Sequence, residues 1–149
     1  MINIIKDFKT SELTDTRFIH PVKVSFNLNG KDKTWEAVSS HDSVAILLYH
    51  QEKNAFLLVK QFRAPVYLND INKTYTYELC AGLVDKDKSL IEIAKEEIDE
   101  ECGYDVALSD IQKVTSFFTN VGISGGCQHL FFAKINESMK IHEGGGIND

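Results

Sequence analysis

The chain has 149 residues, with 22 acidic and 16 basic side chains, and its formal net charge is −6. Its 43% hydrophobic and 10% aromatic residues are typical of one folded globular domain and exclude a disordered chain. The negative charge argues against a nucleic-acid partner. We expect no membrane partner, because no apolar run approaches the roughly 18 residues of a membrane-spanning helix and the polar N-terminus does not resemble a signal peptide.

The three cysteines, Cys80, Cys102 and Cys127, are odd in number and include no C-x-x-C pair. This usage argues against a disulfide framework and against a zinc site. We expect free, mostly buried thiols and a reducing, cytoplasmic location. The five histidines are scattered along the chain, so a histidine metal site is improbable.

The first third of the chain reads as strands. Residues 22–28 alternate between apolar and polar side chains, residues 29–30 are Asn-Gly, and residues 34–38 return as a second strand that contains Trp35. This pattern predicts an antiparallel hairpin. Residues 43–49 are nearly all apolar, which predicts a strand buried on both faces.

The middle of the chain is less regular. We expect residues 55–62 to form another buried strand, which Pro65 ends. Residues 67–73 are interpreted as a loop, residues 75–79 as a short strand, and residues 81–82 as a tight turn.

One helix is strongly indicated. Ser89 and Glu92 have the spacing of a capping box, and Gly103 is a plausible C-terminal stop. Strands at residues 111–118 and 128–135 follow, with a glycine-rich loop between them. About seven strands with one strong helix predict an α+β or mixed α/β fold.

The net charge is concentrated on this helix and the loop before it. Residues 85–101 hold eight acidic and three basic side chains, which is −5 of the total −6. At helical spacing Glu97, Glu100 and Glu101 point the same way, beside an apolar face. That apolar face is expected to pack on the sheet and consists of Ile91, Ala94, Ile98 and Cys102. Clustered carboxylates favour a hard cation such as Mg²⁺ or Mn²⁺; the alternative is a solvated acidic helix face.

Residues 82–104 resemble the Nudix box, G-x5-E-x7-R-E-U-x-E-E-x-G-U, in which U is a bulky apolar residue. The segments 41–47, 58–63 and 78–85 are similar to the nucleoside-diphosphate-sugar branch of that family, so the resemblance runs from about residue 29 to 146. This branch includes ADP-ribose pyrophosphatases and UDP-sugar diphosphatases. The sequences around Cys80 and Gly122 are more similar to the UDP-sugar enzymes.

The resemblance implies a mixed β-sheet sandwiched by helices, with an N-terminal antiparallel strand pair. Residues 1–40 would form a hairpin and dimerisation segment, and residues 41–149 the hydrolase domain. The family usually continues with another strand and helix, so we expect a chain that is shortened at its C-terminus. The implied assembly is a homodimer.

The implied reaction is metal-dependent hydrolysis of the diphosphate bond of a nucleotide sugar, with Mg²⁺ as cofactor and Mn²⁺ as the alternative. The family's metal-binding and catalytic glutamates match Glu97, Glu100 and Glu101, and a further metal ligand matches the carbonyl of Ala81. Substrate-binding roles match Arg63, Glu78 and Trp35; their alternatives are a surface arginine, an edge-strand charge and a packed indole. Candidates for the general base are Glu143 and Asp149.

Two box positions depart from the pattern, because the family glutamate is Lys88 and the family arginine is Glu96. We expect these two side chains to form a reversed ion pair. Alternatives are that Lys95 replaces the arginine or that the loop carries a small deletion. The departures leave open a Nudix-fold module that binds nucleotide sugars without cutting them; a third reading is a hydrolase of another nucleotide diphosphate.

Overall fold

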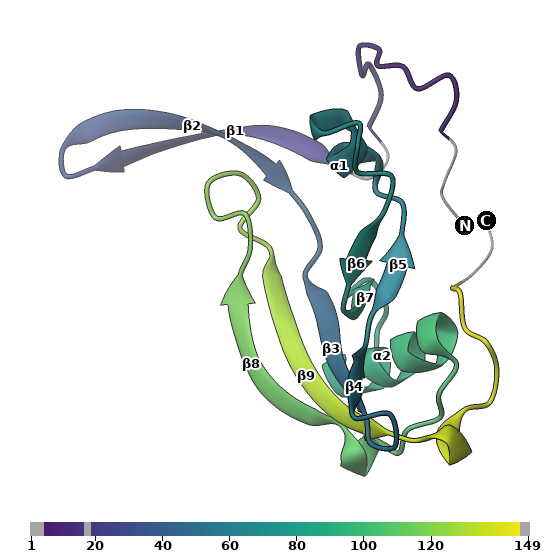
Figure 1. Ribbon diagram of the computed structural model, residues 1–149. Coiled ribbons are helices and arrows are strands. Elements are labelled where there is room, and N and C mark those ends of the chain that lie inside the picture. Colours follow the sequence, from purple (N-terminus) through teal and green to yellow (C-terminus); the bar gives the residue numbers. More distant parts are fainter. Residues whose placement is uncertain (1–4, 17–18, 147–149) are drawn as a thin grey trace.

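The central sheet is built around β3 (Ser43–His50) in the computed structural model, which describes residues 5–16 and 19–146 (Figure 1). On one side β3 is parallel to β9 (Cys127–Ile135), and β9 is antiparallel to β8 (Gln112–Phe118). On its other side β3 pairs with two strands in succession. They are β7 (Cys80–Leu83) and β4 (Ala55–Leu57). The sheet is therefore mixed, and the predicted α+β class is confirmed.

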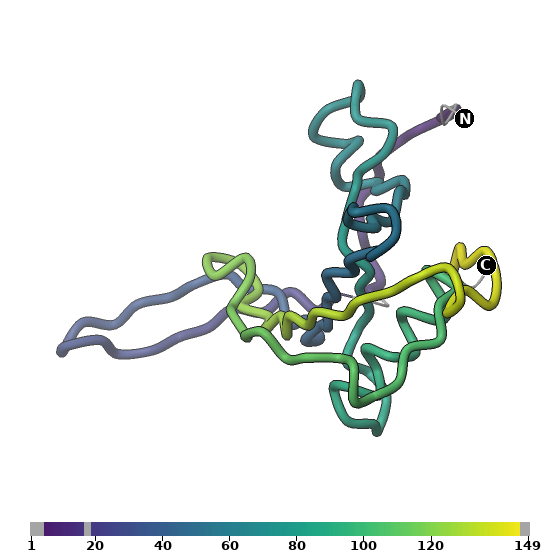
Figure 2. The backbone as a smooth tube through the Cα atoms, turned by 60° about the horizontal axis from the view of Figure 1, so that its bottom comes forward, coloured from purple at the N-terminus to yellow at the C-terminus, as the bar shows by residue number. Residues whose placement is uncertain are grey.

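The N-terminal strand pair is confirmed as a hairpin of β1 (His20–Leu28) and β2 (Lys31–Ser39). Its turn has positive φ at both central residues, 55° at Asn29 and 80° at Gly30, as the two-residue turns of twisted hairpins require. The hairpin projects from the rest of the molecule in both views (Figures 1 and 2). Its hydrogen bonds to the body come from Trp35 and Val38, which bond carbonyls of the loop after β8.

The predicted helix begins and ends as expected. It is α2 (Leu90–Glu97), followed without a break by a π-helical turn (Ile98–Cys102). Ser89 and Glu92 form the capping box, and Gly103 ends the helix with a φ of 75°. The face that packs on β7 and β3 differs in one residue from the prediction, because Ile93 is fully buried and Ile91 only partly.

The predicted buried strand at residues 55–62 is wrong. The chain pairs with β3 over β4 only, leaves the sheet at Leu58, and forms β5 (Val59–Gln61) in a separate two-stranded sheet with β6 (Thr76–Glu78). The reason is competition for one edge. In the continued register Val59 would lie opposite Ile46, but that position is paired with Cys80 of β7. Most side chains of 55–62 are consequently exposed or partly buried.

Two further expectations are corrected. Part of the predicted loop at 67–73 is helical, because α1 (Ala64–Asn69) follows β5 and carries Pro65 in its first turn, where proline costs no helical hydrogen bond. Ala81 and Gly82 are not a turn; they are paired residues of β7. Short 3₁₀ turns complete the described elements at Leu108–Asp110 and Glu137–Met139.

The core lies between α2 and the sheet. Its members are apolar residues of β3, β7, α2, the π-helical turn and β9, together with Tyr104, Val106 and Ile111. The other face of β3 is less well covered, since Leu47 and Tyr49 are only partly buried. None of the helices in the described part of the chain is long and apolar enough to cross a membrane.

We expect Ile93→Ala to destabilise the protein by about 2–5 kcal/mol, because it leaves a cavity between α2 and the sheet. Ile91→Ala removes a partly buried side chain, and its cost should be only about 1–2 kcal/mol. Urea denaturation followed by circular dichroism measures both free energies of unfolding. Equal losses would contradict the assigned helix face.

Candidate active site

The three predicted glutamates lie on consecutive turns at the end of the helix. Glu97 ends α2, and Glu100 and Glu101 belong to the π-helical turn. All three are partly buried, and this end of the helix packs against β7. The Ala81 amide of β7 donates a hydrogen bond to Glu101 Oε2 at 3.1 Å. Burial raises the pKa of Glu101, although this hydrogen bond opposes the shift.

Gly82 makes room for the carboxylate of Glu97. A Cβ atom at Gly82 would lie 2.0 Å from Glu97 Oε1, which is far inside contact distance. Glu97 therefore occupies the space that a side chain on β7 would fill. Burial raises the pKa of Glu97, and the negative charges of Glu101 and Glu100 raise it further.

The chemistry of this cluster suits a hard cation. Its donors are all carboxylate oxygens, and two of the carboxylates have pKa values raised by burial and by neighbouring negative charge. A divalent ion would offset this repulsion. In the described residues, however, the three carboxylates do not bring one oxygen each within 4.8 Å of the others. Binding of one ion by all three would require a change of side-chain rotamer.

Arg63 and Glu78 are paired with each other. Arg63 Nε and Nη2 donate to the two oxygens of Glu78 at 3.0 and 2.8 Å, a bidentate arrangement. These hydrogen bonds lower the pKa of Glu78. Burial still raises the pKa of Glu101, and the charge of Arg63 opposes that rise. The structure thus brings the predicted substrate arginine and acid beside the glutamate cluster.

The predicted ion pair between Lys88 and Glu96 is confirmed, because Lys88 Nζ contacts Glu96 Oε1. Lys86 Nζ lies 3.1 Å from the other carboxylate oxygen of Glu96. The hydrogen bonds from Lys88 and Lys86 lower the pKa of Glu96. Lys95 does not take the place of the family arginine; it contacts Asp105 instead.

A cleft of about 330 Å³ adjoins Glu101 on the side of β5. Its polar lining includes Lys60, Tyr104, Lys140 and Glu143. Lys60 and Lys140 were not predicted as site residues. Lys60 could have been noticed because it alternates outward next to the Gln-Phe-Arg segment, but nothing local distinguishes Lys140.

Of the two candidate general bases, the structure describes only Glu143. Glu143 lines this cleft, is 93% exposed, and pairs with Lys140 at 3.0 Å. Asp149 lies outside the described residues.

Trp35 is not brought to the glutamates within one chain. It lies on the projecting hairpin, where its Nε1 donates to the Gly122 carbonyl at 2.9 Å and its side chain stays 57% exposed (Figure 1). A role near the site would require a second copy of the chain.

One histidine lies near two carboxylates in a group whose atoms are close enough to hold a metal ion: His50, Glu52 and Glu137. His50 Nδ1 accepts the Lys53 amide at 3.4 Å, so a neutral imidazole carries its proton on Nε2, the atom that faces Glu137. The ammonium of Lys53 also contacts Glu137. The cluster is therefore arranged as an ion-pair network with its own cation.

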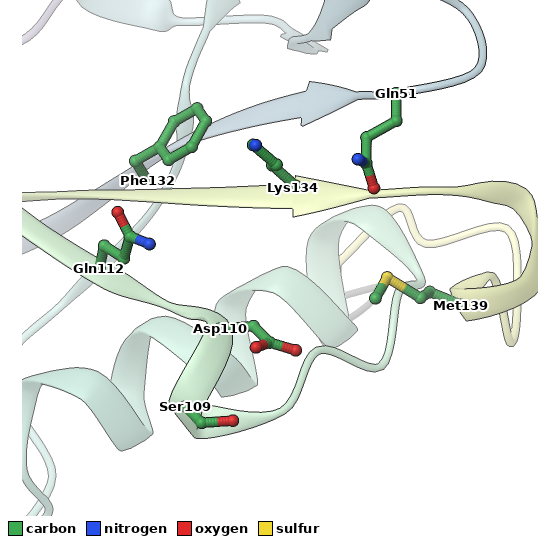
Figure 3. A pocket seen from close by; sticks show the side chains of 7 residues that line it. All are labelled: Gln51, Ser109, Asp110, Gln112, Phe132, Lys134 and Met139. Atoms are coloured by element: carbon green, nitrogen blue, oxygen red, sulfur yellow. The ribbon is translucent and has the colours of Figure 1, made fainter.

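A separate cavity of about 270 Å³ lies between β8, β9 and the two 3₁₀ turns (Figure 3). Phe132 and Lys134 of β9 and Gln112 of β8 point into it. None of the predicted site residues lines it, so it is not the candidate active site.

No family model matches the chain. Uridine diphosphate glucose pyrophosphatase NUDT14 of Bos taurus is 34% identical over 156 aligned residues, which cover 87% of this chain and 70% of that protein. The Mus musculus protein of that name is 29% identical with the same coverage. GDP-mannose pyrophosphatase of Cronobacter sakazakii is 32% identical over 153 residues, or 99% of this chain and 76% of that protein.

A mixed α+β fold with three box glutamates on one helix end is the arrangement expected of a class of enzymes, the hydrolases of diphosphate compounds. Together with these relatives it shows that the chain belongs to the Nudix hydrolases, in their nucleotide-sugar pyrophosphatase branch.

We expect Gly82→Ala to displace the Glu97 carboxylate and to weaken Mn²⁺ binding roughly tenfold or more, because Glu97 is an expected metal ligand. The matched control is Gly122→Ala, where the added Cβ meets no atom within 4 Å. Isothermal titration calorimetry measures both affinities. Unchanged affinity in Gly82→Ala would contradict the role of Glu97.

Proposed function

We propose that this protein hydrolyses the diphosphate bond of a nucleoside-diphosphate sugar and releases a nucleoside monophosphate and a sugar phosphate. The observation that carries the proposal is the carboxylate cluster at the end of α2, set against β7 beside the Arg63–Glu78 pair. The relatives named UDP-glucose and GDP-mannose pyrophosphatases support this substrate class.

The proposed cofactor is Mg²⁺, with Mn²⁺ as a possible substitute. Its proposed ligands are the carboxylates of Glu97, Glu100 and Glu101 and the carbonyl of Ala81. The all-oxygen donor set and the space left by Gly82 support this assignment. When bound, such an ion neutralises diphosphate charge and increases the acidity of water.

The chain's own groups would bind and orient the substrate. Arg63 offers a planar guanidinium whose Nε and Nη2 are held by Glu78, so the group is already oriented and Nη1 faces the substrate phosphate in our proposal. Water attacks one phosphorus, the bond from that phosphorus to the bridging oxygen breaks, and the second phosphate leaves with the bridging oxygen. Glu143 is the proposed acceptor of the water proton, because it lines the cleft beside Glu101.

A homodimer formed through residues 1–40 would explain the exposed hairpin. Successive outward residues of β1 and their neighbour on β2 form one apolar face, and each is at least 40% exposed. They are Val22, Val24, Phe26, Leu28 and Trp35. An apolar face of this kind favours burial against a second copy. In such a dimer Trp35 could stack on the nucleobase at the partner's site.

The thiols support a reducing, cytoplasmic location. All three cysteines are free, and Cys80 and Cys102 are buried. The hydrogen bond with Cys102 and burial raise the pKa of the Cys80 thiol, which keeps it protonated. Cys80 is therefore a packing residue and not a nucleophile.

We expect turnover of UDP-glucose or GDP-mannose with Mg²⁺, and a fall of kcat by at least roughly 100-fold in Glu100→Gln and Glu101→Gln, since each removes a metal ligand. Phosphate release is measured with a coupled phosphatase on a panel that adds ADP-ribose, a diadenosine polyphosphate and a nucleoside triphosphate.

The matched control for this assay is Asp110→Asn, an acid outside the site, whose kcat should equal that of the wild type. Tight binding of one nucleotide sugar without turnover of any compound would overturn hydrolysis in favour of a binding module. Turnover of the other diphosphates alone would overturn the substrate class.

We expect the wild-type protein to sediment at twice the chain mass and the double variant Val24→Glu/Phe26→Glu to sediment as a monomer, because two charges are then placed in the apolar face. Ser25→Glu, on the opposite face of the hairpin, should leave the dimer intact. Sedimentation velocity measures all three. A wild-type monomer would contradict the proposal.

A further inference from the structure

The chain returns to the end of the glutamate helix after β9. We call residues 140–146 the strap. Its course beside the end of α2 is visible in both views (yellow, Figures 1 and 2). The backbone of Lys140 forms an isolated antiparallel β-bridge with Tyr104. The amides of Ile141 and His142 donate to the Gly103 carbonyl at 2.8 and 3.3 Å.

The strap bonds the backbone of two of the proposed metal ligands. The Gly145 amide donates to the Glu101 carbonyl at 2.9 Å, and the Gly146 amide donates to the Glu100 carbonyl at 3.0 Å. The last carbonyls of a helix have no partner within the helix. The strap therefore supplies the missing donors at the two residues whose side chains complete the carboxylate cluster.

Close approach between strap and helix requires glycine on both sides. A Cβ atom at Gly144 would lie 2.3 Å from the Glu101 carbonyl oxygen, and one at Gly103 would lie 1.9 Å from the His142 carbonyl oxygen. Both glycines also have positive φ, 67° and 75°. The backbones thus touch without any side chain between them.

His142 joins the two segments through both ring nitrogens. Its Nδ1 accepts the Gly144 amide at 3.0 Å, so the neutral ring carries its proton on Nε2 and donates to Asp99 Oδ1 at 2.7 Å. Asp99 directly precedes Glu100 in the π-helical turn. One imidazole therefore fixes the turn of the strap and its distance from the helix.

We propose that the strap holds the backbone of Glu100 and Glu101 in the orientation that binds the metal, with His142 and Gly144 as positioning residues. This inference rests on the proposed function, because it concerns the same glutamates. Residues that orient metal ligands typically change metal affinity by roughly 10–100-fold when they are mutated. The strap accordingly sets the metal affinity without contacting the ion.

The first test compares Gly144→Ala with Gly125→Ala, a control outside the strap. The two glycines have similar positive φ, 67° and 63°, so both variants carry the same kind of backbone strain. Only the Cβ at position 144 meets the Glu101 carbonyl; at position 125 it meets no atom within 4 Å. Mn²⁺ affinity, measured by electron paramagnetic resonance, should fall roughly tenfold or more in Gly144→Ala and by less than about twofold in Gly125→Ala.

The second test uses His142, in case Gly144→Ala does not fold. His142→Ala should lose Mn²⁺ affinity, whereas His142→Gln, which keeps a donor for Asp99, should recover part of it. Hydrogen exchange of the Gly145 and Gly146 amides should accelerate in His142→Ala, and thermal melting of the core should change little. Equal Mn²⁺ affinity in wild type and His142→Ala, or in Gly144→Ala and Gly125→Ala, would overturn the proposal.

These readouts separate the strap from the proposed reaction. Wild-type protein that binds Mn²⁺ but turns over no nucleotide sugar would overturn the hydrolase assignment, while the strap would still be judged by the affinities of its variants. Wild-type protein that binds no Mn²⁺ would overturn both.

Discussion

Partial burial of carboxylates at one helix end is the constraint on which the candidate site depends. Glu97 and Glu101 are held against β7, where burial and mutual repulsion disfavour their charged forms. In β7, the Ala81 amide donates a hydrogen bond to Glu101, and Gly82 leaves space for the Glu97 carboxylate. Lys86 and Lys88 are bound by Glu96, on the solvent side of the same helix. The acids of this helix end therefore differ in their surroundings: Glu97 and Glu101 are held against β7, whereas Glu96 is neutralised by two lysines. Lys86 also lies 4.0 Å from Glu100 Oε1.

This division explains why the net charge of −6 is a poor description of the site. Most of the excess acid lies in residues 85–101, yet one of those acids is already paired with two lysines. The charge of Arg63 beside Glu101 is balanced by its partner Glu78. Bound divalent cations would bring the local charge close to neutral or positive, which is what a diphosphate requires. The total charge of the chain argues only against a nucleic-acid partner. The clustering of the carboxylates at one helix end is what indicates a divalent cation as the ligand.

Much of the fold follows from local patterns. Alternation and the Asn-Gly turn predicted the hairpin, and the capping box and Gly103 predicted both ends of the helix. The split of residues 55–62 could not be predicted this way, because it results from competition between β4 and β7 for one edge of β3. Box spacing placed Glu97, Glu100 and Glu101 together and anticipated the Lys88–Glu96 pair. The strap was missed because its partners are distant in sequence, and a run of glycines indicates flexibility as readily as close packing.

The π-helical turn that carries Glu100 and Glu101 inserts one residue into the helical register, and such insertions are frequent at functional sites. Removing one residue from this turn would restore a regular α-helix and move Glu100 and Glu101 from the positions that they hold relative to Glu97. The composition of the helix would hardly change, but the carboxylates would diverge, and the Glu100 and Glu101 carbonyls that accept the strap amides would turn away. Loss of a single residue here would therefore be far more damaging than most substitutions, so the length of the helix is as much a part of the site as its glutamates.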